Sequence, residues 1–290
     1  MSSSSASTVA NEIILPKNFD ISRLSYGVPK QQTTGCKTIF LNYSGKQLYM
    51  QTPEMKAPFG ISVWPSDNGG PDKHAIELSF EGRELRESVE QFFQSTQAID
   101  KRLLQDAMDN SQTWFKKKYP SIDVVEALYT PTVKYSKDRE TGEINTRYAP
   151  TFKMSLPLKD GKFQFPCYGA HRSEIDLHEV IQSGRSKGAR VQAIVQLSAV
   201  WIVGTKFGLM WKVRQLKISE PVRLAGYAFQ PTEDDVPDED DEVAADAAPP
   251  PVVRRIPAPP SAAAARGGGA PMMMAESDTE EDGDAAGIEP

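Results

Sequence analysis

Hydrophobic and polar residues alternate over much of the chain, most clearly in KFGLMWKVRQLKI, residues 206–218. One side of this segment carries apolar residues at a period of two: Phe207, Leu209, Trp211 and Val213. The other side carries three cations and no acid: Lys206, Lys212 and Arg214. A period of two is typical of a strand with one buried face. The apolar phase shifts at Leu216 and Ile218, which predicts a β-bulge.

Several other segments alternate in the same way and are bounded by turn residues. They are residues 37–43, 46–52, 59–64, 74–80, 132–136, 147–158 and 191–203. Three short links between such segments consist of turn-forming residues: Ser44-Gly45, Asp160-Gly161 and Gly204-Thr205. Two-residue links of this composition favour tight hairpins. We therefore expect antiparallel strands joined by hairpins, including one hairpin between residues 37–43 and 46–52.

Residues 84–118 break the strand pattern. Their apolar residues recur mainly at steps of three and four, without Gly or Pro, which predicts an amphipathic helix or a pair of helices. Asp109, Asn110 and Ser111 mark the expected break, and Pro120 ends the helical segment. A short second helix is expected over residues 174–182.

The order of these segments is typical of a mainly β protein of the α+β class. Many short strands, one substantial helix inserted among them and little alternation of strand with helix favour an antiparallel barrel. We expect a five-stranded oligonucleotide-binding (OB) barrel with an inserted long helix and extra hairpins. A β-sandwich is the alternative architecture.

Charge divides the chain into a basic body and an acidic tail. The formal net charge is −6, yet residues 231–290 hold 16 Asp and Glu against 3 Lys and Arg. Residues 1–230 therefore hold 30 basic and 23 acidic residues, a net charge of +7. A basic body attracts polyanions, and an acidic tail repels them or competes with them.

The same composition sets the expected domain boundaries. Residues 231–290 contain no Phe, Trp or Tyr, so they cannot bury enough apolar surface to order their backbone. We expect a flexible N-terminus over residues 1–18 and an OB-like nucleic-acid-binding body over residues 19–230. Residues 231–290 are expected to form a disordered acidic tail rich in Pro and Ala.

Cysteine usage and hydropathy indicate an intracellular, reducing location. The two cysteines, Cys36 and Cys167, are too few for a disulfide framework. No apolar run reaches the roughly 18 residues that a membrane span requires. The start of the chain also lacks the charged-then-apolar pattern of a secretion signal. We therefore expect no membrane association.

The cations of residues 206–218 have neighbours of the same charge just before the preceding strand. The Gly-rich stretch SGRSKGAR, residues 183–190, contributes three of them: Arg185, Lys187 and Arg190. Flexible basic loops beside a barrel are suited to clamping a sugar-phosphate backbone. Both groups of cations together form the expected phosphate-binding set. A solvated sheet face is the alternative interpretation.

Aromatic residues on polar faces are the expected platforms for nucleic-acid bases. Tyr49 shares its strand face with Gln47 and Gln51, which makes it the best candidate. Trp211 lies among aliphatic residues and is expected in the core. Further candidates combine a ring with a neighbouring cation: Tyr135 with Lys134, and Phe152 with Lys153. Tyr168 is a weaker candidate, and burial is the alternative for each of these rings.

Catalytic and metal chemistry find little support. The chain has three histidines, none of them in a Ser-His-Asp or HExxH pattern. Cys167, His171 and His178 are close in sequence but lack a fourth ligand and a recognised zinc spacing. GRSKG, residues 184–188, lacks the spacing of a nucleotide-binding P-loop. We expect no catalytic residue, no metal and no cofactor.

Two segments resemble a known protein family. Residues 48–64, LYMQTPEMKAPFGISVW, and residues 196–218, QLSAVWIVGTKFGLMWKVRQLKI, are similar to single-stranded-DNA-binding proteins of large nucleocytoplasmic DNA viruses of algae and protists. The resemblance covers most of the body and not the tail. It implies an OB barrel and a role in viral DNA replication, recombination or repair. The implied location is a viral replication site in host cytoplasm or nucleus, or the virion.

The resulting hypothesis is a non-catalytic protein that binds single-stranded DNA, or RNA, with little sequence preference. Its acidic tail competes for the groove when nucleic acid is absent and recruits replication proteins when nucleic acid is bound. Ser277 and Thr279 are candidate phosphorylation sites that would add negative charge to the tail. The alternative is a β-rich virion structural or assembly protein. A nuclease or other enzyme is a third option, but the sequence lacks the clustered acidic residues that it would need. The sequence does not determine whether the protein forms homo-oligomers.

Overall fold

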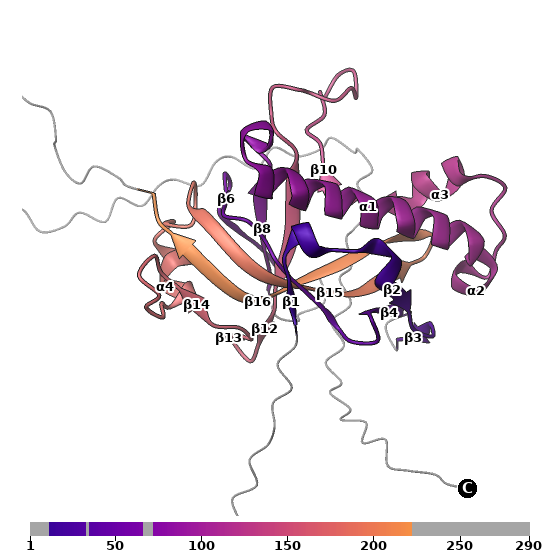
Figure 1. Cartoon of the computed structure of the whole chain (residues 1–290), viewed down its shortest axis with the longest axis horizontal. Helices are drawn as coiled ribbons and strands as arrows, with labels where there is room; N and C mark the ends of the chain where they lie inside the picture. Colours follow the sequence, from indigo (N-terminus) through magenta and orange to yellow (C-terminus); the bar gives the residue numbers. More distant parts are fainter. Residues whose placement is uncertain (1–11, 33–34, 66–71, 222–290) are drawn as a thin grey trace, which may run out of the picture. The chain divides into compact units, whose positions relative to one another are not determined.

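The computed structural model describes residues 12–32, 35–65 and 72–221 of the protein. Within these ranges the chain is mostly β, with a mixed sheet and a few helices (Figure 1). The acidic tail expected over residues 231–290 lies outside the described residues. None of the described helices is long and apolar enough to cross a membrane.

The described chain begins with short strands and 3-10 helices and ends with two long strands. In chain order the strands are β1 (Ile13–Ile14), β2 (Leu24–Tyr26), β3 (Lys30–Gln31), β4 (Lys37–Tyr43), β5 (Leu48–Gln51), β6 (Met55–Lys56), β7 (Ile61–Trp64), β8 (Lys73–Ser79), β9 (Tyr129–Thr130), β10 (Val133–Lys134), β11 (Thr151–Leu156), β12 (Leu158–Lys159), β13 (Lys162–Phe163), β14 (Cys167–Tyr168), β15 (Arg190–Val203) and β16 (Lys206–Ser219). The helices are α1 (Glu87–Asp109), α2 (Ser111–Phe115), α3 (Ile122–Leu128), α4 (Leu177–Gln182) and the 3-10 helices η1 (Pro16–Asn18), η2 (Ile21–Arg23) and η3 (Arg83–Leu85).

Strand pairings in the main sheet return to their starting point. β15 pairs with β6, β6 with β8, β8 with β11, β11 with β16, and β16 again with β15. On the edge of β15 that faces away from β16, β4, β5 and β6 pair one after another. The expected antiparallel architecture is wrong in one respect, because β1, β9, β11 and β14 each have a parallel partner.

One face of each long strand is buried in a common core. Buried residues alternate with less buried ones, as Phe152 and Met154 show in β11. α1 lies across this core (Figure 1), and the ring of Phe92 packs edge-on against that of Phe152 with centroids 5.1 Å apart. Complete burial of such a side chain stabilises the fold by about 1.5–3 kcal/mol. Burial of the apolar residues on the core faces of the strands therefore contributes much of the stability of the fold.

The helical segment expected over residues 84–118 is confirmed as α1 and α2, which are separated at Asn110. α1 buries its apolar stripe, while charged residues such as Arg102 and Asp106, 2.7 Å apart, lie on its other side. The short helix expected near residues 174–182 is confirmed as α4. The sequence pattern did not predict α3, because only one of its seven residues, Val125, is buried.

β15 and β16 form the expected hairpin around Gly204-Thr205. The register of this pair shifts at two points. One shift leaves Arg214 without a cross-strand partner residue, which confirms the bulge expected from the change of apolar phase. Because of this bulge, Trp211 and Leu216 both face the core. Trp211 is 3% exposed, so its predicted core position is confirmed.

The turn at Ser44-Gly45 forms, but it does not join β4 and β5 into a hairpin. Both residues have positive φ angles, 50° and 77°, and Tyr43 and Lys46 exchange backbone hydrogen bonds of 2.6 and 3.1 Å. Beyond this bridge, β4 and β5 both run antiparallel to β15. The expected hairpin is therefore wrong, because beyond this bridge β4 and β5 each pair with β15 and not with each other.

Described structure begins before the expected boundary at residue 19. Ile13 and Ile14 form β1 and pair in parallel with Tyr49 and Met50. The side chain of Ile14 is buried in the core. The flexible N-terminus expected over residues 1–18 is therefore too long at its C-terminal end, because a strand pairing and an apolar contact hold this part of it.

Candidate nucleic-acid interface

The face of the main sheet that points away from the core carries a row of residues across six strands. Register pairs connect the members of the row from β5 to β7: Tyr49, Gln196, Lys212, Ser155, Ala75 and Ser62. We call this face the outer surface. Since neighbouring strands lie about 4.8 Å apart, the row is roughly 24 Å long when it is measured along the curved sheet. The outer surface therefore connects two predicted site residues on β5 and β16 to a third, Lys153, on β11.

A cavity of about 320 Å³ lies on the outer surface between β4, β15 and β16. We call it the Arg214 cavity. Lys212 and Arg214 line it, and within the described part of the chain no Asp or Glu lines it. Phe40, which is 44% exposed, forms part of the wall. A ring beside two cations offers both stacking and phosphate attraction to a single strand of nucleic acid.

A chain of hydrogen bonds holds the cationic wall of this cavity. Arg214 donates from Nε to Oε1 of Gln196 at 2.8 Å, and Gln196 donates from Nε2 to Oε1 of Gln47 at 2.9 Å. The hydroxyl of Tyr49 donates to the same oxygen of Gln47 at 2.6 Å. The bond to Gln196 uses one of the five N–H donors of the guanidinium. Arg214 is thus positioned from one side while its other donors can serve an anion.

A second cationic area lies on the outer surface of β7, β10 and β11. It consists of Trp64, Lys134 and Lys153, and we call it the Trp64 patch. Trp64 is 40% exposed, and Nζ of Lys153 lies 3.9 Å from the centroid of its ring. Burial and the nearby charge of Lys134 lower the pKa of Lys153, against a smaller opposing effect of Glu77. Lys153 is two residues along β11 from Ser155, the neighbour of Lys212. The structure therefore brings Lys134 and Lys153 onto the same surface as the Arg214 cavity.

The basic loop of residues 183–190 does not join these two areas. Arg185 donates to carboxylates of Glu179 at 2.7 Å and Glu220 at 2.9 Å, so ion pairs occupy it. Arg190 lies 3.6 Å from a carboxylate oxygen of Glu54. The exposed Lys187 is not among the residues that line the Arg214 cavity.

Packing also fixes this loop. The hydroxyl of Ser186 accepts a hydrogen bond from the Ile61 amide at 3.1 Å, and the amide of Gly188 donates to the Ala57 carbonyl at 2.8 Å. Gly60 lies directly beneath, with room for hydrogen only, because a Cβ there would lie 2.8 Å from the Lys187 nitrogen. The flexible clamp expected over residues 183–190 is therefore a packed loop.

Three further predicted residues lie outside both cationic areas. Lys206 is at the hairpin tip, where its ammonium donates to the Ala127 carbonyl at 2.8 Å. Tyr135 is partly exposed, and its hydroxyl accepts a hydrogen bond from Gln97 of α1 at 3.3 Å. Phe152 is fully buried, so its predicted contact with nucleic acid is wrong. Its phase in β11 places it in the core.

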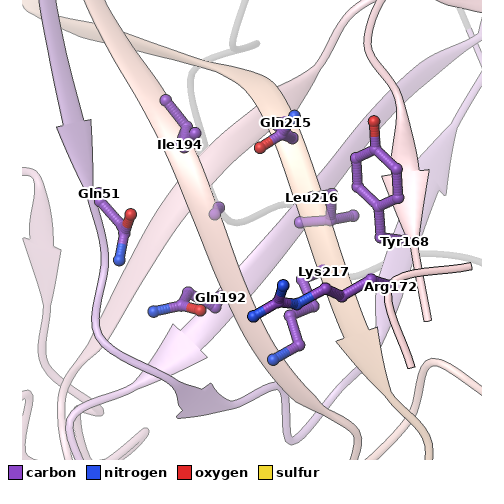
Figure 2. A pocket seen from close by; sticks show the side chains of 9 residues that line it. Gln51, Tyr168, Arg172, Gln192, Ile194, Gln215, Leu216 and Lys217 are labelled. Atoms are coloured by element: carbon purple, nitrogen blue, oxygen red, sulfur yellow. The ribbon is translucent and has the colours of Figure 1, made fainter. Parts of the chain in front are cut away.

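A second cavity, of about 340 Å³, contains residues that the sequence pattern did not single out (Figure 2). We call it the Arg172 cavity. It lies on the outer surface of β15 and β16, and its lining residue Gln215 directly follows Arg214. Arg172 and Lys217 line it together with Tyr168, which is half-buried. Lys217 continues the polar side of β16, but Arg172 belongs to a turn and had no periodic signal.

The buried carboxylate of Asp100 connects elements of the fold and lies outside the candidate interface. Asp100 of α1 accepts hydrogen bonds from the Tyr129 hydroxyl at 2.7 Å and from the Thr132 amide at 3.0 Å. Burial raises the pKa of Asp100, and these hydrogen bonds oppose the rise. The side chain thus ties α1 to β9, and it lines neither cavity. Within the described ranges, no three His, Cys, Asp or Glu residues lie together as metal ligands would.

The fold and these contacts define a mostly β protein with a cationic outer surface and exposed rings. The chain belongs to a family of unknown function, DUF5871, whose model matches residues 76–232, more than half of the chain. No curated protein sequence matches the chain.

Among solved structures, the chain is similar to the single-stranded DNA-binding protein from bacteriophage Enc34 in complex with ssDNA, at 10% identity and a TM-score of 0.36. That match covers 69% of this chain and 98% of the phage protein. The single-stranded DNA-binding protein gp2.5 of bacteriophage T7 matches at 8% identity and a TM-score of 0.35, over 63% of this chain and 98% of gp2.5. Similarity at this level leaves function to be argued from the chain's own residues.

Proposed function

We propose that the protein binds single-stranded DNA, without catalysis, along its outer surface. The observation that carries this proposal is the Arg214 cavity, where Lys212, Arg214 and the exposed ring of Phe40 occur together and none of the described lining residues is acidic. Tyr49 and the Trp64 patch extend the same combination of rings and cations across neighbouring strands. Electrostatic attraction holds the phosphates, and the rings accept bases of any sequence.

We further propose that the circuit of strands is an OB barrel. Taking β4, β5 and β6 together as the first barrel strand, the paired order is first, β8, β11, β16, β15 and back to the first. One parallel pairing, between β11 and β16, closes the circuit. A five-stranded barrel of this kind offers one side to oligonucleotides. On this proposal, α1, α2 and α3 are insertions between the second and third barrel strands.

The preference for a single strand follows from the geometry of the rings. Phe40 and Tyr49 lie on a sheet face, and stacking on them requires a base whose own faces are free. Bases in a duplex already stack on one another, so a duplex would meet only the cations. Stacking contributes about 1–3 kcal/mol per base, which is about a 5- to 150-fold preference for each ring used.

Fluorescence anisotropy with labelled oligonucleotides tests the proposal. The wild-type protein should bind single-stranded DNA more tightly than duplex of the same length, and an RNA arm establishes the choice of sugar. Lys212→Glu together with Arg214→Glu should weaken binding at least about 10-fold and reduce the salt slope, since each phosphate contact contributes about 0.7 to that slope. The matched control is Lys101→Glu with Arg139→Glu, two exposed cations outside both cavities.

Two outcomes would overturn the proposal. Equal affinity for single strand and duplex would remove the role of the rings. Unchanged affinity in the Lys212→Glu and Arg214→Glu variant, with the control also unchanged, would remove the role of the Arg214 cavity. The second outcome favours the alternative of a β-rich virion or assembly protein whose cations meet an acidic protein.

A role in viral DNA metabolism and a function of the acidic tail are proposed from two other observations. The resemblance of residues 48–64 and 196–218 to viral single-strand binders supports a place in viral DNA replication, recombination or repair. The net charge of residues 231–290 supports a tail that competes with nucleic acid and recruits replication proteins. The same resemblance, together with the low cysteine content, supports the proposal of an intracellular site at replicating viral DNA.

A further inference from the structure

The Arg172 cavity has the chemistry of an anion site beside a ring. Among the described residues that line it, Arg172 and Lys217 are the two charged ones, and none is Asp or Glu. Their side chains lie next to each other in Figure 2. Two neighbouring cations repel each other, and an anion placed between them attracts both and so offsets this repulsion. The geometry favours a phosphate-sized ligand here.

The backbone at Arg172 supports a dedicated role for its side chain. Arg172 has a φ angle of 61°, in the left-handed region that disfavours residues with a Cβ. Hydrogen bonds within the turn hold this conformation: the Arg172 amide donates to the Gly169 carbonyl at 3.2 Å, and the Gly169 amide donates to the Ser173 carbonyl at 2.8 Å. Strained residues of this kind are concentrated at functional sites. The turn thus presents a guanidinium where glycine would be the easier choice.

Three amides also line the cavity, and the hydrogen bonds of the described residues do not occupy them. The side chains of Gln51, Gln192 and Gln215 surround the cavity (Figure 2). In the Arg214 cavity, by contrast, Gln47 and Gln196 are bonded to each other. Each free amide can both donate and accept, as the edges of unpaired bases require.

We propose that the Arg172 cavity is a subsite for one nucleotide of the bound strand. Arg172 and Lys217 hold its phosphate, the ring of Tyr168 takes its base, and the glutamine amides contact the edges of that base. This inference rests on the proposed function and adds a position to it. Along β15, the residues that line the two cavities lie between Gln192 and Ala199. This part of the strand is roughly 23 Å long, so both cavities can contact one bound strand.

The charge of the subsite is tested with Arg172→Gly combined with Lys217→Ala. Glycine suits the left-handed backbone at position 172, so this variant removes the guanidinium without straining the turn. Titrations of labelled oligothymidine at several salt concentrations should show weaker binding and a slope of log K against log salt that is smaller by about 0.7, the contribution of one phosphate. Lys101→Ala with Arg139→Ala loses the same charge outside the cavities and should behave as wild type.

The ring is tested separately with Tyr168→Ala and Tyr168→Phe. Removing the ring should weaken binding about 5- to 150-fold at an unchanged salt slope, and Phe should restore most of the affinity, because stacking needs the ring and not the hydroxyl. Failure of wild-type protein to bind oligothymidine would overturn the proposed function. Wild-type binding that depends on Lys212 and Arg214, but equals that of Arg172→Gly with Lys217→Ala in affinity and salt slope, would overturn the subsite alone.

Discussion

At the scale of single residues, the face of a strand decides what a side chain does. Tyr49 and Trp211 lie on strands that both pair with β15, yet they point to opposite faces. Tyr49 borders the Arg214 cavity through its hydroxyl, which donates to Gln47. Trp211 is buried against Phe152, with ring centroids 5.3 Å apart. The two aromatic residues should therefore respond to truncation in different assays.

Trp211→Ala should lower the free energy of unfolding by about 3–5 kcal/mol, because it removes a buried indole and leaves a cavity. Tyr49→Ala should change the free energy of unfolding little and weaken DNA binding, since the ring lies on the outer surface. Urea unfolding followed by circular dichroism, together with DNA titration, measures both quantities. The reverse pattern would mean that the faces of β5 and β16 are exchanged.

Lys153 should make DNA binding depend on pH in the alkaline range. Burial and the charge of Lys134 lower the pKa of Lys153 in the free protein. A bound phosphate favours the ammonium form and raises that pKa, so binding takes up a proton. Affinity should therefore fall as pH rises from the lowered pKa of the free protein to the higher pKa of the complex.

The matched variant for this prediction is Lys153→Arg, whose guanidinium stays charged throughout the alkaline range. Titrations from neutral pH to about pH 10 should show a smaller loss of affinity for Lys153→Arg than for wild type. Parallel curves for the two proteins would place the bound strand away from the Trp64 patch.

Alternation identified side-chain faces because it depends only on neighbours in sequence. It placed Tyr49 outside and Trp211 inside, and applied strictly it also places Phe152 inside with Met154. The adjacent Lys153 led to the wrong interpretation of Phe152. The approach of Arg172 to Lys217 had no local signal, because it depends on the pairing of β14 with β16.

At the scale of elements, strand partners are set by contacts distant in sequence. Ser44-Gly45 forms the expected turn, but β4 and β5 each pair with β15, more than 140 positions away along the chain. The parallel pairing of β11 with β16 joins Ser155 to Lys212, which is also distant in sequence. Local periodicity therefore predicted which segments are strands and where the β15–β16 hairpin turns, and it could not predict the circuit.

The basic loop offers a test of packing between elements. Gly60 has a φ angle of 69°, and a Cβ there would meet the hydroxyl of Ser186 at 2.7 Å and the nitrogen of Lys187 at 2.8 Å. Gly60→Ala should therefore displace the loop of residues 183–190 and destabilise the protein by about 1–3 kcal/mol. Urea unfolding and the rate of proteolysis within the loop measure the two effects.

Gly142→Ala is the matched control, because Gly142 has a similar φ angle of 73° and nothing within 4 Å of its added Cβ. It should show only the conformational cost, about 1 kcal/mol, with unchanged proteolysis of residues 183–190. Equal behaviour of the two variants would show that the loop is not held by Gly60.

At the scale of the whole molecule, the division of charge is the dominant property. Residues 1–230 carry a net charge of +7 and residues 231–290 a net charge of −13. A tethered polyanion acts at a high effective concentration on the cationic surface to which it is linked. Deleting residues 231–290 should therefore raise the affinity for single-stranded DNA. The gain should shrink at high salt, where the attraction of the tail is screened.

Anisotropy titrations of the full chain and of residues 1–230, at low and high salt, check this prediction. A tail of equal length with its acidic residues replaced by Ser and Asn provides the control for bulk. If the full chain and residues 1–230 bind equally at low salt, the tail does not compete and its charge serves another purpose.

The circuit of strands also determines when folding can be completed during synthesis. β16 is the last described strand, and it alone links β9, β11, β14 and β15. Before the ribosome has released it, the edges of β11 and β15 that pair with β16 have no partner strand. Closure of the circuit must then wait for residue 219, with contacts of long sequence separation that form slowly. A nascent chain stalled short of β16 would present those strands to chaperones and to its own copies.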